Sequence, residues 1–253
     1  MTHLAAGLDG VVFSSHGDRL LGAMFLAAGD GPRPTLLLLH GIPGVEKNTD
    51  IAYALRDAGW NTLQFHYRGC WGSAGQYSLT GILDDVVAAT DFVANHPAVD
   101  ATRLALAGNS LGGWAAIVAG AHDTRFRAVV AMCPVVDART APLPPEYATE
   151  FATMLNGISA AEVAAQWAGL TPLPNVAADL AGRPTLLVGA GNDELFPPEH
   201  LRPLAEAAPW IEWKTIEGAD HSFSAHRRTL VETAVAWLQE AMGQDKTWPY
   251  REP

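Results

Sequence analysis

Short runs of consecutive apolar residues recur along the chain, separated by stretches with helical spacing, and this pattern limits the fold more than any other feature. Residues 36–39 and 128–133 are apolar at every position, whereas a strand with one face in water would alternate. Strands that are apolar on both sides are typical of a parallel sheet covered by helices on both faces. Because crossovers between parallel strands are right-handed, the pattern predicts an α/β fold with a doubly wound, mainly parallel sheet. The predicted strands are 11–14, 20–27, 35–39, 61–66, 103–107, 128–133, 185–189 and 211–216, and the predicted helices are 50–58, 82–95, 110–121 and 225–242.

Residues 137–181 interrupt this alternation between two predicted strands. The segment opens with a Pro-rich piece at 141–145 and continues with a weakly amphipathic stretch at 147–167. It is too short to bury a core of its own. We therefore expect a small helical cap inserted into a single domain of residues 1–253. The polar, Pro-rich tail at 247–253 is expected to be loosely held.

The overall composition is that of a globular protein, and it argues against several kinds of partner. Of the 253 residues, 49% are hydrophobic and 17% are charged, and the net charge is -11. A nucleic-acid-binding protein needs a basic stripe, and no run of Lys or Arg occurs, so we expect no nucleic-acid partner. The apolar runs are far too short to cross a bilayer, and the N-terminus lacks a basic, apolar leader. We therefore expect a cytoplasmic protein with no membrane partner.

The spacing of cysteine and histidine predicts neither a disulfide nor a metal centre. The two cysteines, Cys70 and Cys133, are expected to be free thiols in a reducing compartment. The His and Asp residues are scattered without the spacing of metal-binding motifs. No Gly-rich phosphate loop follows the first strand, so we expect no cofactor. The sequence leaves the oligomeric state open.

The most informative short motif is Gly-Asn-Ser-Leu-Gly at residues 108–112, which follows a predicted strand and opens a helix of small residues. A serine on such a sharp strand-to-helix turn is presented as a nucleophile, and small neighbours permit the close packing that the turn requires. The helix points N–H groups and the positive end of its dipole at a developing oxyanion. We therefore predict that Ser110 is a catalytic nucleophile. The alternative is a serine that caps an ordinary helix.

The strand predicted at 35–39 ends in His-Gly-Ile-Pro-Gly at residues 40–44, a loop suited to an oxyanion hole. Acyl transfer needs two N–H donors aimed at one oxygen. Leu111, directly after the nucleophile, is predicted to supply one donor and Ile42 the other. His40 is a weaker candidate for a catalytic base, because we expect it to hydrogen-bond within its own loop.

A nucleophilic serine also needs a base and a third group that orients the base. Among nine histidines, His221 stands out in a short loop between the last predicted strand and the last helix, whereas the second candidate, His226, falls inside that helix. Asp193 follows a buried strand and a glycine turn, where a partner for the base is expected. Glu194 and Asp137 remain alternatives for the acid. We therefore predict His221 as the base and Asp193 as the acid.

Together these motifs resemble the α/β-hydrolase superfamily over nearly the whole chain. They fall in its order, with His-Gly-Ile-Pro-Gly at 40–44, Gly-Asn-Ser-Leu-Gly-Gly at 108–113, Gly-Asn-Asp at 191–193 and Gly-Ala-Asp-His-Ser-Phe at 218–223. The resemblance implies an eight-stranded α/β-hydrolase sheet. It also implies that nucleophile, acid and base follow the chain order Ser110, Asp193, His221.

A further stretch at residues 65–75, Phe-His-Tyr-Arg-Gly-Cys-Trp-Gly-Ser-Ala-Gly, narrows the resemblance. It resembles the Tyr-Arg-Gly-x-Gly-x-Ser segment of the prolyl oligopeptidase-like branch and of related small acyl esterases. Peptidases of that branch carry an N-terminal β-propeller domain, for which we expect no counterpart in this chain. The resemblance therefore implies a small serine carboxylesterase that acts on a small-molecule acyl substrate through an acyl-enzyme intermediate.

The sequence leaves the substrate pocket and the exact reaction open. Trp71, Tyr147 and Trp167 are candidates to line the pocket, although each could instead pack within its own segment. A peptidase, amidase or thioesterase would use the same triad and differ only in the pocket. A non-catalytic binding protein on the same scaffold is the alternative from another class, although such proteins have usually lost a triad residue.

Overall fold

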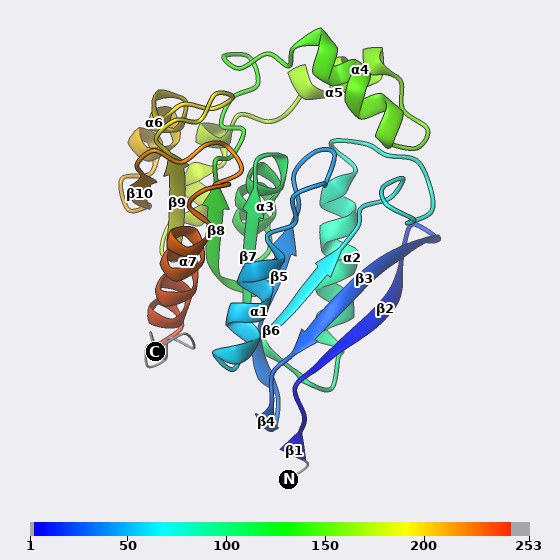
Figure 1. Cartoon of the computed structure of the whole chain (residues 1–253), viewed down its shortest axis with the longest axis vertical. Coiled ribbons are helices and arrows are strands. Elements are labelled where there is room, and N and C mark those ends of the chain that lie inside the picture. The colour runs from blue at the N-terminus through cyan, green and yellow to red at the C-terminus, as the bar shows by residue number, and fades with distance from the viewer. Residues whose placement is uncertain (1–2, 244–253) are drawn as a thin grey trace.

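The computed structural model describes residues 3–243, with an eight-stranded sheet at its centre (Figure 1). In chain order the sheet strands are β2 (Gly7–Ser15), β3 (Asp18–Leu26), β5 (Arg33–Leu39), β6 (Asn61–Phe65), β7 (Val99–Asn109), β8 (Phe126–Met132), β9 (Thr185–Ala190) and β10 (Glu212–Ile216). The helices beside the sheet are α1 (Thr49–Asp57), α2 (Ile82–Ala94), α3 (Leu111–His122), α6 (Pro198–Ala207) and α7 (Arg227–Ala241). The strand order is β10-β9-β8-β7-β5-β6-β3-β2, with β5 to β10 parallel and the β2–β3 hairpin antiparallel at one edge. The predicted doubly wound, mainly parallel α/β-hydrolase sheet is confirmed.

Alternate side chains of the central strands enter two separate apolar cores. Leu37 and Leu39 of β5 pack in the core that contains the buried residues of α2 and α3. Leu36 and Leu38 pack in the core that contains those of α1 and α7. Because helices cover both faces of the sheet, neither side of β5 meets water, which explains why its run has no polar position.

The insertion predicted at 137–181 is helical. Between β8 and β9 the chain forms α4 (Pro145–Met154), α5 (Ala160–Ala168) and two short 3-10 helices, η1 (Leu173–Asn175) and η2 (Ala177–Leu180). Figure 1 shows α4 and α5 at the top, above the edge of the sheet at which the parallel strands end. Ligand sites of open α/β sheets lie at this edge. The insertion therefore covers the edge where a site is expected.

Helix α6 and a small strand pair were not predicted from the sequence. Pro203 lies inside α6 and removes a backbone donor, which is why the sequence pattern gave no helix there. The helix forms nonetheless because Leu201 and Leu204 are buried in the apolar core that also contains Leu37 and Leu39. β1 (His3–Leu4) pairs with β4 (Gly29–Asp30) in a separate antiparallel pair.

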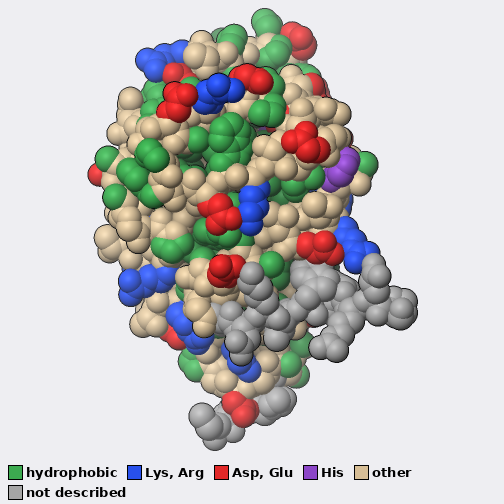
Figure 2. Space-filling view, turned by 90° about the vertical axis from the view of Figure 1, so that its left-hand side faces the viewer, with side chains coloured by type: hydrophobic (Ala, Val, Ile, Leu, Met, Phe, Trp, Pro, Cys, Tyr) green, Lys and Arg blue, Asp and Glu red, His purple; other side chains and the backbone are tan. Residues whose placement is uncertain are grey.

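The surface of the molecule carries charges of both signs. On the face that includes α6, β10 and α7, acidic and basic side chains are interspersed with small apolar patches (Figure 2). Within residues 3–243 no helix has the length and apolar character needed to span a bilayer. The expectation for the tail at 247–253 lies outside the described residues.

Candidate active site

Ser110 lies between β7 and α3, at the sharp turn that its motif predicts. Its backbone angles are φ 57° and ψ -122°, a region that is costly for a residue with a side chain. A Cβ atom on Gly108 would overlap the carbonyl group of Gly112, and one on Gly112 would overlap the carbonyl oxygen of Leu39. The turn is therefore held by close backbone packing that glycine permits, and it presents Ser110 at the carboxyl end of β7.

His221 and Asp193 form a buried pair at the ends of neighbouring strands. Asp193 follows β9 and His221 follows β10, and these strands are adjacent in the sheet. The Nδ1 atom of His221 lies 2.8 Å from Oδ2 of Asp193, and both side chains are buried. When Nδ1–H is donated to the carboxylate, the lone pair of the neutral ring lies on Nε2, which is the tautomer that a base needs.

The Asp193 carboxylate is bound through both oxygens. Oδ1 accepts the N–H groups of Leu195 at 2.9 Å and Phe196 at 2.8 Å. Burial is the largest influence and raises the pKa of Asp193, but the hydrogen bond and charge of His221, with further help from Phe196 N–H and the Cys133 thiol, outweigh it. The pKa of Asp193 consequently lies below its ordinary value, and the group is a carboxylate at neutral pH.

The Cys133 thiol is a further partner of this carboxylate. Burial, followed by the nearby charge of Asp193, raises the pKa of Cys133 well above its ordinary value. The thiol therefore keeps its proton at neutral pH and donates a hydrogen bond to the Asp193 carboxylate. Three ligand-type atoms, one each from Cys133, Asp193 and His221, lie within 4.8 Å of one another. Their closeness is explained by hydrogen bonds around one carboxylate. Both cysteines, Cys70 and Cys133, are free and buried.

The two predicted oxyanion donors are backbone groups beside Ser110. Gly41 packs directly against the serine, because a Cβ atom on Gly41 would lie 3.0 Å from Ser110 Cβ. This contact brings the loop that carries Ile42 next to the nucleophile, while Leu111 is the first residue of α3. In the part of the chain that the structure describes, neither N–H group has a hydrogen-bond partner. Both are thus available to a negatively charged oxygen at the positive end of α3.

His40 lies behind this loop and supports it. Its Nδ1–H donates to the carbonyl oxygen of Gly41 at 2.7 Å, and the Tyr67 hydroxyl donates to the carbonyl oxygen of His40 at 3.2 Å. Burial lowers the pKa of His40 to about 3, so the ring is neutral at physiological pH. His40 does not line the cavity beside Ser110, which agrees with a supporting place in the loop.

The alternatives for the acid and the base do not take part in the His221–Asp193 hydrogen bond. The Asp137 carboxylate accepts two N–H groups of Arg139, at 2.9 and 2.6 Å. Glu194 lines the cavity beside Ser110, but the carboxylate hydrogen-bonded to His221 is that of the preceding residue. His226 immediately precedes α7 rather than lying within it. The geometry therefore favours the pair that the sequence predicted first.

Ser110, His221 and Ile42 line one cavity of about 850 Å³. This volume is typical of sites for small molecules. Three segments supply the apolar lining, namely the oxyanion loop, the helical insertion, and the loop and helix after β9. Their apolar members are Ile42, Pro43, Val45, Ala141, Pro142, Leu143, Pro144, Tyr147, Phe151, Trp167, Leu195, Phe196, Pro197 and Pro203.

Of the three predicted pocket residues, Tyr147 and Trp167 lie in this wall and Trp71 does not. Contrary to the prediction, Trp71 supports the outer side of the oxyanion loop, where its indole N–H donates to the carbonyl oxygen of Pro43 at 2.6 Å. The Lys47 ammonium lies 5.6 Å from the centre of its ring. Trp71 has a left-handed backbone with φ 48°. Strand spacing predicts the direction of a side chain only for extended backbone, so it could not predict where Trp71 points.

Phe196 is a contact residue that sequence reasoning missed. Its ring centre lies 5.2 Å from that of His221, 4.9 Å from that of His200 and 6.3 Å from that of Trp167. Phe196 therefore connects the predicted base to the insertion. The available signal was its position three residues after Asp193, in the same loop.

Known proteins share both the sequence and the fold of this chain. Residues 49–245 match the model of the prolyl oligopeptidase family. An uncharacterised protein of Mycobacterium tuberculosis is 29% identical in an alignment that covers 92% of this chain and 82% of the relative. The sequence similarity is thus spread along most of the chain.

Two solved structures share the fold at low sequence identity. An esterase of Pyrococcus furiosus has a TM-score of 0.73 at 19% identity, covering 94% of this chain and 92% of its own. A puromycin-hydrolysing peptidase of Mycobacterium tuberculosis has a TM-score of 0.74 at 18% identity, covering 95% of this chain and 40% of its own. At these identities the likeness shows the fold alone. The family match extends over Ser110, Asp193 and His221, and the chain accordingly belongs to the prolyl oligopeptidase family of α/β hydrolases.

Proposed function

We propose that this hydrolase cleaves carboxylic esters of small or medium acyl groups through an acyl-enzyme intermediate on Ser110. The observation that carries the proposal is the buried His221–Asp193 pair, of which His221 lines the same cavity as Ser110. A serine nucleophile needs a base and a group that orients the base. This pair supplies both roles.

In the first half-reaction, Nε2 of His221 takes the proton of Ser110 as the serine oxygen attacks the ester carbonyl carbon. The carbonyl oxygen becomes negatively charged and receives the N–H groups of Ile42 and Leu111. Asp193 stabilises the imidazolium that forms. His221 then gives the proton to the leaving alcohol as the C–O bond breaks, which leaves the acyl group on the serine.

In the second half-reaction, water takes the place of the alcohol. His221 removes a proton from the water as it attacks the acyl-enzyme, and the same two N–H groups stabilise the second oxyanion. The proton then returns to the oxygen of Ser110, and the carboxylic acid leaves. The free enzyme is restored without a net proton change on the triad.

The lining of the cavity supports a neutral, largely apolar acyl group. The insertion contributes Leu143 and Phe151, and the loop after β9 contributes Phe196. The charged members of the lining in the described chain are four glutamates, Glu46, Glu150, Glu194 and Glu199, without a lysine or arginine. Negative charge on this lining disfavours substrates that carry a carboxylate.

A panel of p-nitrophenyl esters of increasing acyl length tests the proposal. We expect Ser110→Ala and His221→Ala each to lower kcat by at least about 10⁴-fold, since each removes a group that the chemistry needs. A fluorophosphonate probe should label the wild-type protein and leave Ser110→Ala unlabelled. Equal labelling of both proteins, or hydrolysis by Ser110→Ala at the wild-type rate, would exclude Ser110 as the nucleophile.

Hydrolysis of amides or peptides by the same triad is the second candidate. Membership of the prolyl oligopeptidase family and the fold shared with a puromycin-hydrolysing peptidase favour it. Aminoacyl anilides measured beside the esters separate the two reactions. Because amides are intrinsically less reactive, a kcat/KM for an anilide within about tenfold of the best ester would identify a peptidase or amidase.

A further inference from the structure

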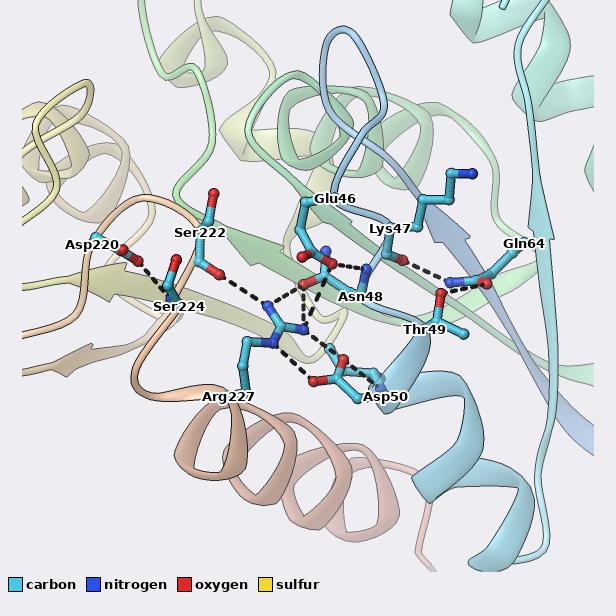
Figure 3. Close-up of polar contacts among 11 residues, drawn as sticks. Glu46, Lys47, Asn48, Thr49, Asp50, Gln64, Asp220, Ser222, Ser224 and Arg227 are labelled. Carbon is cyan, nitrogen blue, oxygen red and sulfur yellow. Dashed lines mark hydrogen bonds and ion pairs between the residues drawn. The ribbon is translucent and has the colours of Figure 1, made fainter. Parts of the chain in front are cut away.

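Arg227, the first residue of α7, hydrogen-bonds to three residues, and its Nη2 also lies 3.9 Å from Oε1 of Glu46 (Figure 3). Its Nε and Nη2 donate to the two carboxylate oxygens of Asp50 at 2.8 and 2.5 Å. Nη1 and Nη2 both donate to Oδ1 of Asn48 at 3.0 Å, and Nη1 also donates to the carbonyl oxygen of Ser222 at 3.0 Å. The side chain is 24% exposed. All three nitrogens of the planar guanidinium donate hydrogen bonds, an arrangement that a lysine cannot reproduce.

On one side, Arg227 holds the chain that leaves the oxyanion loop. Asn48 is buried and has a left-handed backbone with φ 53°. Its N–H group donates to Oε1 of Glu46 at 2.5 Å, and Glu46 lines the cavity. The bonds to Asn48 and Asp50 therefore fix the C-terminal end of the loop that carries Ile42 near its start.

On the other side, Arg227 holds the loop of the predicted base. Ser222, which accepts through its carbonyl oxygen, directly follows His221 and also lines the cavity. Figure 3 shows the guanidinium between the segments 46–50 and 220–224. Across residues 3–243, Arg227 is the one residue that hydrogen-bonds to both segments.

We propose that Arg227 is a positioning residue that keeps the His221 loop and the oxyanion loop at the spacing the reaction needs. The inference rests on the proposed function of the site. The two loops follow β10 and β5, which are not neighbours in the sheet, so no ladder of backbone hydrogen bonds joins the strands directly. Acyl transfer requires the base and the oxyanion donors to be in place at the same moment. A displacement of about 1 Å between such groups can cost about a hundredfold in rate.

The main test compares Arg227→Gln with Arg228→Gln. Arg228 is the next residue of α7, its side chain is 66% exposed, and it pairs with Glu232 of the same helix. For Arg227→Gln we expect kcat on the best ester to fall about tenfold to a hundredfold, with KM changed by less than about twofold. Arg228→Gln should leave both constants unchanged. The kinetics are measured well below the melting temperature of each variant.

Two further variants separate positioning from a general loss of stability. Arg227→Lys keeps the charge, but its single nitrogen cannot reproduce the five hydrogen bonds of the guanidinium, so it should recover only part of kcat. Asn48→Gly removes the acceptor shared by two guanidinium nitrogens, and glycine adopts the same left-handed backbone. Asn48→Gly should lower kcat in the same direction. The double variant of Asn48→Gly and Arg227→Gln should lose no more than about twofold beyond the worse single variant, since both act through one contact.

The outcomes distinguish this inference from the proposed function. If Ser110→Ala is inactive and Arg227→Gln has a lower melting temperature but wild-type kcat, Arg227 is a structural tie and the positioning role is wrong. The same conclusion follows if Arg228→Gln loses as much kcat as Arg227→Gln. If Ser110→Ala hydrolyses the esters like the wild-type protein, the proposed function itself fails.

Discussion

Replacement of Asp193 by asparagine tests the site most sharply, because asparagine keeps the shape of aspartate but cannot accept hydrogen bonds with both ends. In the native protein, Oδ1 accepts the N–H groups of Leu195 and Phe196, and Oδ2 accepts Nδ1–H of His221. In Asp193→Asn the amide oxygen has to stay on the two backbone donors, because an NH₂ group there would face them. The NH₂ group then faces His221, which must accept through Nδ1. The ring proton moves to Nε2, where it blocks the proton transfer from Ser110.

The expected loss of kcat is about 10⁴-fold at neutral pH, or about 5 kcal/mol of activation free energy, which is typical of the wrong histidine tautomer in such a triad. The assay is steady-state hydrolysis of the best p-nitrophenyl ester, with the melting temperature as a check that the variant is folded. Asp137→Asn is the matched control, because Asp137 is the other acid candidate and pairs with Arg139. It should keep kcat within about twofold.

Two results would refute this reasoning. One is a folded Asp193→Asn protein that keeps more than about a tenth of the wild-type kcat. The other is a loss of similar size in Asp137→Asn, which would place the acid after β8 instead of after β9. In either case the hydrogen bond between Asp193 and His221 would not be the one that orients the base.

Acidification should destabilise the fold, because burial lowers the pKa of His40 to about 3 from an ordinary value of 6.5. The unfolded state therefore binds a proton that the folded state excludes, so this stability is present above pH 6.5 and is lost as the pH falls from 6.5 towards 3. Urea melts should show that His40 accounts for a loss of about 2 kcal/mol in the free energy of unfolding between pH 7 and pH 5. His40→Asn lacks this contribution, so its loss should be smaller by that amount. An equal loss in both proteins would contradict the reasoning. Trp167→Leu enlarges the cavity and should raise kcat/KM for long acyl chains relative to short ones by at least about tenfold. Trp71→Leu lies outside the cavity and should leave that ratio unchanged, so a shift of equal size in both variants would argue against Trp167 as a lining residue.

The sheet could be read from the sequence because its strands are buried on both faces. The run of four leucines in β5 contains no polar residue, since Leu37 and Leu39 enter one core and Leu36 and Leu38 the other. The helix α6 could not be read in this way. Its interior Pro203 contradicts local propensity, and only the burial of neighbouring leucines against the rest of the protein stabilises the helix.

The sequence by itself determined the turn at Ser110, the order of the motifs and the first-choice partners, Asp193 and His221. These features depend on short spacings, such as glycines two residues on either side of a serine, which impose the same local geometry wherever they occur between a strand and a helix. Only the tertiary structure decided that Trp71 supports the 40–44 loop instead of lining the cavity, that Phe196 joins the predicted base to the insertion, and that Arg227 bridges two loops. Arg227 and Asp50 are far apart in the chain, and no local spacing can encode a contact that exists only after β5 and β10 have taken their places in one sheet.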